Sequence, residues 1–168
     1  LSTNEEGMPK KHADVAVYLR CSTDDQSVAA QQATLTNYLL AHGLDLNECE
    51  LYIDEGVSAK KYPNFTDRTE GSRLVKDIES GKIKTLWGFQ VDRFFRRVAA
   101  GATWVELMAK KYPHVKILTQ DCQAPTNTAA GRTLWHLLLM IAESENEARG
   151  EKTGGGMQNK QELLQKTS

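Results

Sequence analysis

Short apolar runs alternate along the chain with segments whose apolar residues recur at helical spacing. The runs are rich in β-branched and aromatic residues and predict strands at 13–20, 49–56, 83–91 and 115–120. The periodic segments end at a glycine or before a proline and predict helices at 28–42, 72–80 and 93–112. Because strands alternate with helices, the expected fold class is α/β, with a mostly parallel sheet of four or five strands flanked by helices.

Two segments depart from this alternation. Residues 57–71 carry lysines and a proline and lack periodicity, which predicts a mobile loop of the kind that often holds functional side chains. Near the end of the chain one long helix is predicted at about 130–152, and the glycines at 154–156 are expected to interrupt it. Its apolar stripe consists of Leu134, Leu137, Leu138 and Ile141. A stripe of this kind usually completes the core of its own domain.

Length and composition limit the possible classes of protein. With 168 residues and 40% hydrophobic content, one compact domain is expected after a flexible N-terminal arm, residues 1–12, which is either natural or a remnant of expression. No apolar stretch approaches the ~20 residues of a membrane span, so we expect a cytoplasmic protein. The widely spaced Cys21, Cys49 and Cys122 predict buried reduced thiols rather than disulfides or a zinc site.

Charge by itself does not indicate a nucleic-acid-binding protein. The formal net charge is -1, whereas domains that bind many phosphates are usually clearly basic. The segment 82–116 is nevertheless rich in lysine and arginine. On charge alone this segment is best explained as a solvated basic surface.

The candidate chemistry lies where the first and third predicted strands end. Ligands of parallel α/β sheets bind at the carboxyl ends of strands, so Ser22 and the segment DRFFRR at 92–97 are expected to share a crevice. The arginines of this set are Arg20, Arg68, Arg93 and Arg96. Their permanently charged forks suit phosphate oxygens and stabilise the charge of phosphoryl transfer, and they lower the cost of a serine alkoxide. Asp92 could orient an arginine or move a proton.

Each of these residues also has a structural explanation. Ser22–Asp24 is an ordinary capping sequence, and Asp24 or Asp25 can begin the next helix. The segment DRFFRR can form the first turn of a helix whose arginines pair with nearby acids. An arginine in a loop, such as Arg68, is ordinarily exposed. These alternatives remain open at the level of single residues.

Other catalytic motifs are absent from the sequence. A cysteine phosphatase loop needs an arginine six residues after Cys21, where Ser27 stands. A serine hydrolase elbow needs glycines where Arg20 and Asp24 flank Ser22. The glycine motifs of nucleotide-binding proteins are missing, and the four histidines are scattered, so neither a cofactor nor a metal is expected.

Four motifs, in order, resemble the catalytic domain of the serine recombinases, the resolvase and invertase family that includes large serine integrases and some transposases. YLRCSTDDQ at 18–26 resembles the family's Tyr-x-Arg-x-Ser-Thr segment, and DEGVSAKKYPNFTDR at 54–68 resembles its mobile loop ending in arginine. VDRFFRR at 91–97 resembles Asp-Arg-x-x-Arg, and residues 131–153 resemble the long helix with a glutamate-rich end. The resemblance covers about Val15 to Thr153, and it assigns a catalytic domain to residues 13–153.

This resemblance implies site-specific recombination of double-stranded DNA through a 5' phosphoserine intermediate. Ser22 is implied as the nucleophile, Asp92 as the proton handler and Gln31 as a supporting residue. The residues implied around the scissile phosphate are Arg20, Arg68, Arg93 and Arg96. The residues implied to contact DNA are Ser58, Lys60, Lys61, Asn146, Arg149 and Lys152. Cys21, next to the nucleophile, is expected to point away from the site.

The family also implies assembly into a homodimer and, in the active complex, a tetramer. The implied contacts are Leu134, Leu137, Leu138 and Ile141 of the long helix. Residues 154–168 are expected to be a linker or the start of a DNA-binding region. The resemblance also implies that the protein acts in the cytoplasm of a bacterium, and that its gene belongs to the bacterium or to a phage.

Several positions depart from the family pattern. Asn146 and Lys152 stand where the family usually has arginine, and Ala59 replaces the glycine that commonly follows the loop serine. Two rival functions remain: an inactive recombinase-like module that only oligomerises or binds DNA, and another metal-independent phosphoryl-transfer enzyme. The target DNA and the direction of the reaction are not encoded in any motif of the chain.

Overall fold

The computed structural model describes residues 2–22 and 27–166, with side chains described as far as residue 150. Its four strands are β1 (His12–Cys21), β2 (Cys49–Glu55), β3 (Thr85–Gly88) and β4 (Lys116–Thr119). They form one parallel sheet in the order β2-β1-β3-β4. The helices are α1 (Val28–Ala41), α2 (Thr69–Glu79), α3 (Val98–Lys111) and α4 (Ala129–Lys166). The predicted α/β class and parallel sheet are therefore confirmed.

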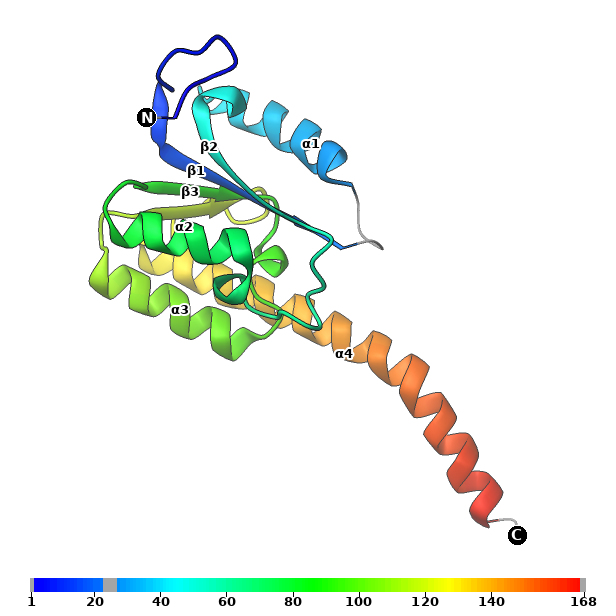
Figure 1. Cartoon of the computed structure of the whole chain (residues 1–168). Coiled ribbons are helices and arrows are strands. Elements are labelled where there is room, and N and C mark those ends of the chain that lie inside the picture. The colour runs from blue at the N-terminus through cyan, green and yellow to red at the C-terminus, as the bar shows by residue number, and fades with distance from the viewer. Residues whose placement is uncertain (1, 23–26, 167–168) are drawn as a thin grey trace.

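Both faces of the sheet are covered. Alternate residues of a strand point to opposite faces, and β1 is buried from Val15 onward. Val17 and Leu19 pack in one apolar cluster with Leu35 and Leu39 of α1. Tyr18 belongs to the second cluster, which includes residues of α2, α3 and α4. Figure 1 shows the same layering, with α1 on one side of the sheet and α2 and α3 on the other.

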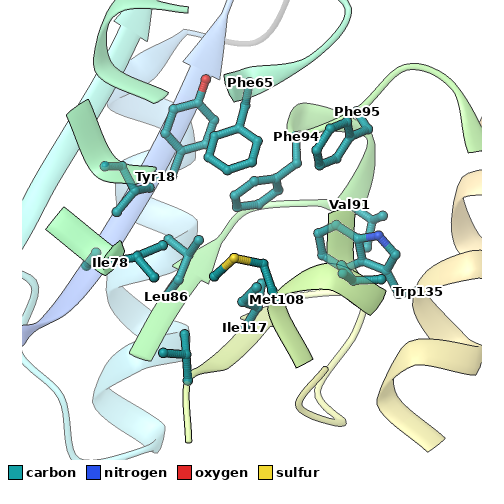
Figure 2. Packing of buried hydrophobic residues seen from close by; sticks show 14 of the residues in the cluster. Tyr18, Phe65, Ile78, Leu86, Val91, Phe94, Phe95, Met108, Ile117 and Trp135 are labelled. Atoms are coloured by element: carbon teal, nitrogen blue, oxygen red, sulfur yellow. The ribbon is translucent and has the colours of Figure 1, made fainter. Parts of the chain in front are cut away.

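Aromatic rings fill the second cluster beneath the segment that follows β3 (Figure 2). Phe94 lies 5.1 Å from Tyr18 and 5.7 Å from Trp135 of α4, measured between ring centroids. Gly88 makes room for this ring, because a Cβ at that position would lie 2.1 Å from a Phe94 ring carbon. Phe95 is buried as well. The two phenylalanines of DRFFRR thus anchor the segment in the core, and the arginines lie on either side of them.

The structure corrects the expected start of α3. Residues Val91–Arg93 form a short 3-10 helix (η3), and α3 begins only at Val98. The intervening residues pair instead with the segment before α2: Phe65 N–H donates to the Phe94 carbonyl at 2.7 Å, and Arg96 N–H donates to the Pro63 carbonyl at 2.9 Å. Burial of two adjacent phenylalanines is incompatible with one exposed helical turn, so the interpretation of DRFFRR as a helix start is wrong.

The structure also shows which side chains set the starts of α1 and α2. The side chain of Ser27 caps α1 by accepting the Ala30 N–H at 3.2 Å. Ser27 was not among the predicted capping residues, of which Thr23, Asp24 and Asp25 lie outside the described residues. Helix α2 begins at Thr69, earlier than predicted, because the buried carboxylate of Asp54 at the end of β2 accepts two N–H groups of its first turn.

Helix α4 does not end near residue 152 as expected. Its backbone continues through Gly154–156 to Lys166. A glycine inside a helix costs about 1 kcal/mol relative to alanine, so it weakens a helix without forbidding it. Among the described residues, no helix combines the length and the apolar content needed to cross a membrane.

The segment before β1 folds back on itself and is bonded to residues at the start of β2. Thr3 and Pro9 form an antiparallel bridge, so the segment turns back on itself. The Asn4 side-chain amide donates to Glu48 at 2.9 Å, and the Lys11 N–H donates to the other oxygen of that carboxylate at 2.9 Å. These bonds attach the segment to the start of β2.

Candidate active site

An open groove of about 510 Å³ lies where β1 and β3 end, between these neighbouring strands and α4. Residues from four separate segments line it: Arg20 and Ser22; Gly56, Ser58, Ala59 and Lys60; Asp92, Arg93 and Arg96; and Asn146 and Arg149. The second of these segments directly follows β2. Figure 1 shows the chain after β2 running toward α4. The structure therefore brings together most of the predicted site residues.

Ser22 directly follows β1 and is partly buried in the wall of the groove. The neighbouring Arg20 is almost fully buried, and its guanidinium donates to the Val57 carbonyl at 3.0 Å. Gln31 of α1 does not line the groove; it is fully buried and donates from Nε2 to the Arg20 carbonyl at 3.1 Å. Cys21 is buried and is not among the lining residues. The end of β1 is thus fixed from behind by α1 and from the side by the segment after β2.

Asp92, Arg93 and Arg96 come from the segment anchored by the phenylalanines. Asp92 lies 3.9 Å from Nε of Arg93, measured from Oδ1, and its side chain is 43% exposed. The Arg93 side chain is only 12% exposed, and its guanidinium carbon lies 6.0 Å from the centroid of the Phe89 ring. Packing against the ring and the carboxylate restricts this arginine to the wall of the groove.

Arg68 does not line the groove, contrary to the sequence-based expectation. It is also not exposed, as an ordinary loop arginine would be, since only 1% of its surface is accessible. Its Nε donates to the Tyr62 carbonyl at 3.0 Å, and Nη1 donates to the Tyr18 hydroxyl at 3.1 Å and to the Arg93 carbonyl. Arg68 therefore holds the backbone of the groove's arginine segment from beneath.

Sequence reasoning missed Tyr18 and Asp54. The Tyr18 hydroxyl donates to Oδ2 of Asp54 at 2.9 Å, and both side chains are buried. Burial raises the pKa of Tyr18, and the positive charge of Arg68 opposes that shift. The available signal was positional, because Asp54 lies near the end of the second predicted strand, at the same sheet edge as Ser22. The pair joins β1, β2 and the start of α2 under the groove.

The predicted DNA-contacting residues divide into three groups. Ser58, Lys60, Asn146 and Arg149 line the groove, and a hydrogen bond joins the Arg149 guanidinium to the Asn146 side-chain oxygen. Lys61 is exposed and outside the groove, with its ammonium 5.5 Å from the centroid of the Tyr62 ring. The side chain of Lys152 lies outside the described residues.

The described residues that line the groove are mainly cationic. Among them, five side chains carry a positive charge at neutral pH and one carries a negative charge. The cations are Arg20, Lys60, Arg93, Arg96 and Arg149. Converging guanidinium groups favour an anion with several oxygens, such as a phosphodiester. Within the described part of the chain, no group of three or more histidine, cysteine or acidic residues could hold a metal ion.

The side chains of the predicted apolar stripe lie on two different sides of α4. Leu134 and Leu138 are partly buried and pack against the core. Leu137 and Ile141 are 51% and 50% exposed, and Met140, which the sequence reasoning did not include, is 56% exposed. The helix therefore completes its own core on one side and leaves an apolar surface, Leu137–Met140–Ile141, on the other.

Comparisons with known proteins identify the family of the chain. The family model described as "Resolvase, N terminal domain" matches residues 15–163. The chain is 26% identical over 140 residues to the DNA-invertase hin of Salmonella typhimurium, with 83% of this chain and 65% of that protein covered. The same identity and length relate it to the serine recombinase gin of Escherichia phage Mu, with 64% of that protein covered. The chain thus spans about two thirds of the length of these relatives.

A solved structure gives the same assignment. The crystal structure of the N-terminal catalytic domain of TP901-1 integrase is 28% identical and superposes with a TM-score of 0.58, covering 80% of this chain and 97% of that one. The matched range of the family model, residues 15–163, includes all four strands from Val15 onward and most of α4. We conclude that the chain belongs to the resolvase N-terminal domain family, the catalytic domain of the serine recombinases.

Proposed function

We propose that this chain is the active catalytic domain of a site-specific DNA recombinase, with Ser22 as its nucleophile. The observation that carries the proposal is the groove in which Ser22 meets Arg20, Arg93 and Arg96. A serine that only capped a helix would need no arginines, and the cap of α1 is Ser27. The arrangement supports attack on a phosphodiester.

In the proposed step, Oγ of Ser22 attacks the scissile phosphorus. The bond from phosphorus to the 3' oxygen breaks, the DNA 5' end remains attached to Ser22 as a phosphoserine, and the other end leaves as a 3' hydroxyl. The leaving oxygen gains one proton and the serine hydroxyl loses one, and Asp92 is the proposed handler of these protons. The arginines stabilise the charge on the nonbridging oxygens. Because the phosphoester is retained, religation needs no external energy source.

The remaining residues have proposed supporting roles. Gln31 and Arg68 fix the backbone on which the groove's arginines stand. The proposed DNA contacts are Ser58, Lys60, Lys61, Asn146, Arg149 and Lys152. The proposed setting is the cytoplasm of a bacterium, with a second copy of the chain bound to the exposed apolar surface of α4 and two such dimers forming the active tetramer.

A covalent-capture experiment tests the function. The full-length protein that carries this chain is incubated with a randomised library of duplex DNA, and the mixture is denatured with detergent. We expect DNA to remain attached to the protein and mass spectrometry to find the nucleotide on Ser22. Sequencing of the captured DNA then identifies the recombination site.

Two serine variants control this experiment. Ser22→Ala is expected to bind the captured DNA and to form no adduct. Ser27→Ala removes the cap of α1, at a cost of about 1 kcal/mol, and is expected to retain the adduct. A wild-type protein that binds duplex DNA without becoming attached supports the inactive module instead. A protein that releases phosphate from small phosphoesters through the same groove supports a different phosphoryl-transfer enzyme.

A further inference from the structure

The N-terminus of α3 is capped by another helix. Its own first turn, Val98–Gly101, contains no acidic residue, and within the described residues Arg97 makes no side-chain capping bond. Instead the Val98 N–H donates to Oε2 of Glu143 in α4 at 2.8 Å. A carboxylate at this position satisfies a free N–H group and interacts favourably with the helix dipole. This hydrogen bond ties α4 to the point where α3 begins.

The same carboxylate also lies near Arg97, but this contact is the weaker one. Oε1 of Glu143 is 3.9 Å from Nη1 of Arg97. The Arg97 side chain is 73% exposed, whereas that of Glu143 is 24% exposed. Ion pairs with an exposed partner contribute little because water and salt screen them. The backbone hydrogen bond, and not the ion pair, is therefore expected to fix Glu143.

On the N-terminal side of Glu143, helices α3 and α4 are in direct contact. A Cβ at Gly101 of α3 would lie 2.3 Å from Cδ1 of Leu139 and 3.2 Å from Cβ of Phe95. Leu139 is fully buried and precedes Glu143 by four residues, or about one turn of α4. Contact at Leu139 and capping at Glu143 thus set the position of α4 along α3.

On the C-terminal side of Glu143, α4 and the arginine-bearing segment both contribute side chains to the groove. Asn146 comes three residues later on α4 and lines the groove, and Arg96 comes two residues before Val98 and lines it as well. Both side chains also border a small hollow of about 110 Å³ that Glu143 lines. Glu143 therefore lies where the wall carrying the arginines meets the wall carrying Asn146.

We propose that Glu143 is a positioning residue that keeps α4 in register with the arginine-bearing segment. This inference rests on the proposed function, because the register matters only if Arg93 and Arg96 act on a phosphate that α4 also contacts. Because Glu143 accepts the Val98 N–H, a shift of α4 would also move the end of the arginine-bearing segment. A second copy bound to the exposed surface Leu137–Met140–Ile141 would thereby influence the position of the arginines.

Three variants separate the cap from the ion pair. Glu143→Ala removes both, Glu143→Gln keeps an oxygen that can accept the Val98 N–H, and Arg97→Ala removes only the ion pair. Glu147→Ala is the matched control, because Glu147 is an exposed acid one turn later on α4 that lines the same small hollow. The DNA for these measurements is the site captured with the wild-type full-length protein.

We expect Glu143→Ala to slow formation of the Ser22 adduct roughly tenfold, the size typical of a lost helix cap, at nearly unchanged affinity for DNA. Hydrogen exchange should accelerate at Val98 and Ala99 in the same variant. The Glu143→Gln, Arg97→Ala and Glu147→Ala variants should remain within about threefold of wild type in both measurements, because each keeps an acceptor for the Val98 N–H.

Val98→Pro tests the same bond from the other partner. Proline is tolerated at the first position of a helix and has no N–H to donate, and the backbone angles of Arg97, φ -112 and ψ 139, suit a residue before proline. This variant should slow adduct formation as Glu143→Ala does, and the double variant should be no slower than either single variant. Val98→Pro decides the matter if Glu143→Ala does not fold.

Two results would overturn the positioning role. One is a wild-type rate of adduct formation in folded Glu143→Ala or Val98→Pro, and the other is failure of Glu143→Gln to restore the rate. Failure of the proposed function has a different signature: the wild-type protein itself then forms no adduct with DNA that it binds.

Discussion

The hydroxyl of Tyr18 bridges two buried groups, since it donates to Asp54 at 2.9 Å and accepts from Arg68 at 3.1 Å. Tyr18→Phe removes this bridge and leaves a buried carboxylate and a buried guanidinium each short of one partner. We expect the free energy of unfolding to fall by about 1–3 kcal/mol. Adduct formation should fall as well, because Arg68 also holds the Arg93 carbonyl. Urea unfolding and the covalent-capture assay measure the two effects.

Tyr52→Phe is the matched control for this prediction. Tyr52 is the register partner of Tyr18 on β2 and is equally buried, but its hydroxyl donates to Asp77, at 2.5 Å, rather than to the network beneath the groove. Its loss should reduce stability and leave adduct formation near the wild-type rate. Equal losses of activity in the two variants would show that general stability, and not the bridge, governs the site.

Arg68→Lys is expected to behave as a severe substitution despite its retained charge. A lysine ammonium cannot reproduce the planar fork that reaches the Tyr62 carbonyl, the Tyr18 hydroxyl and the Arg93 carbonyl together. We expect a loss of about 3 kcal/mol or more in urea unfolding, because buried acceptors lose their donors. Arg73→Lys, at an exposed arginine of α2, should change stability by less than about 0.5 kcal/mol. Equal stability of the two variants would contradict the role assigned to Arg68.

The exposed surface of α4 predicts a separation of assembly from folding. Ile141→Glu places a charge on the half-exposed side of the helix, so it should weaken self-association on DNA while the melting temperature changes little. Leu139→Ala empties a fully buried position of the same helix and should cost about 2–5 kcal/mol of stability. Sedimentation with the captured DNA and thermal unfolding distinguish the two. Unchanged self-association of Ile141→Glu would exclude this surface as the contact.

Two buried thiols predict a loss of stability at alkaline pH. All three cysteines are free and buried, as the sequence predicted, and burial raises the pKa of Cys49 and of Cys122 to about 11. In the unfolded chain a thiol titrates near pH 8.5. The stabilisation is therefore complete below about pH 8.5 and is lost as the pH rises through 11, because the unfolded state releases its protons first.

Unfolding experiments between pH 8.5 and 10 measure this effect. Each thiol should contribute a slope approaching about 1.4 kcal/mol per pH unit. Cys49→Ala and Cys122→Ala should each remove one such contribution. An identical slope in wild type and both variants would show that the two thiols do not remain neutral in the folded protein over this range.

Much of the fold was determined by local pattern. The alternation of apolar strands with periodic helices predicted the parallel sheet, and the strand ends at Ser22 and before Arg93 predicted where the groove would lie. These inferences succeed because side-chain periodicity reports which face of an element is buried, and because ligands bind where parallel strands end. They do not report which residues far apart in sequence contact each other.

Tertiary packing decided the rest. Local pattern assigned Phe94 and Phe95 to a helix, but the rings of Tyr18 and Trp135 draw Phe94 into the core and leave the neighbouring arginines at the groove. The chain likewise specified an arginine at position 68, yet only the buried Tyr18 and the nearby Arg93 carbonyl turned it from the groove to a supporting position. Sequence by itself determined which chemical groups are available and at which sheet edge they lie. The tertiary structure determined which of them face the groove, because that choice depends on burial and on hydrogen-bond partners distant along the chain.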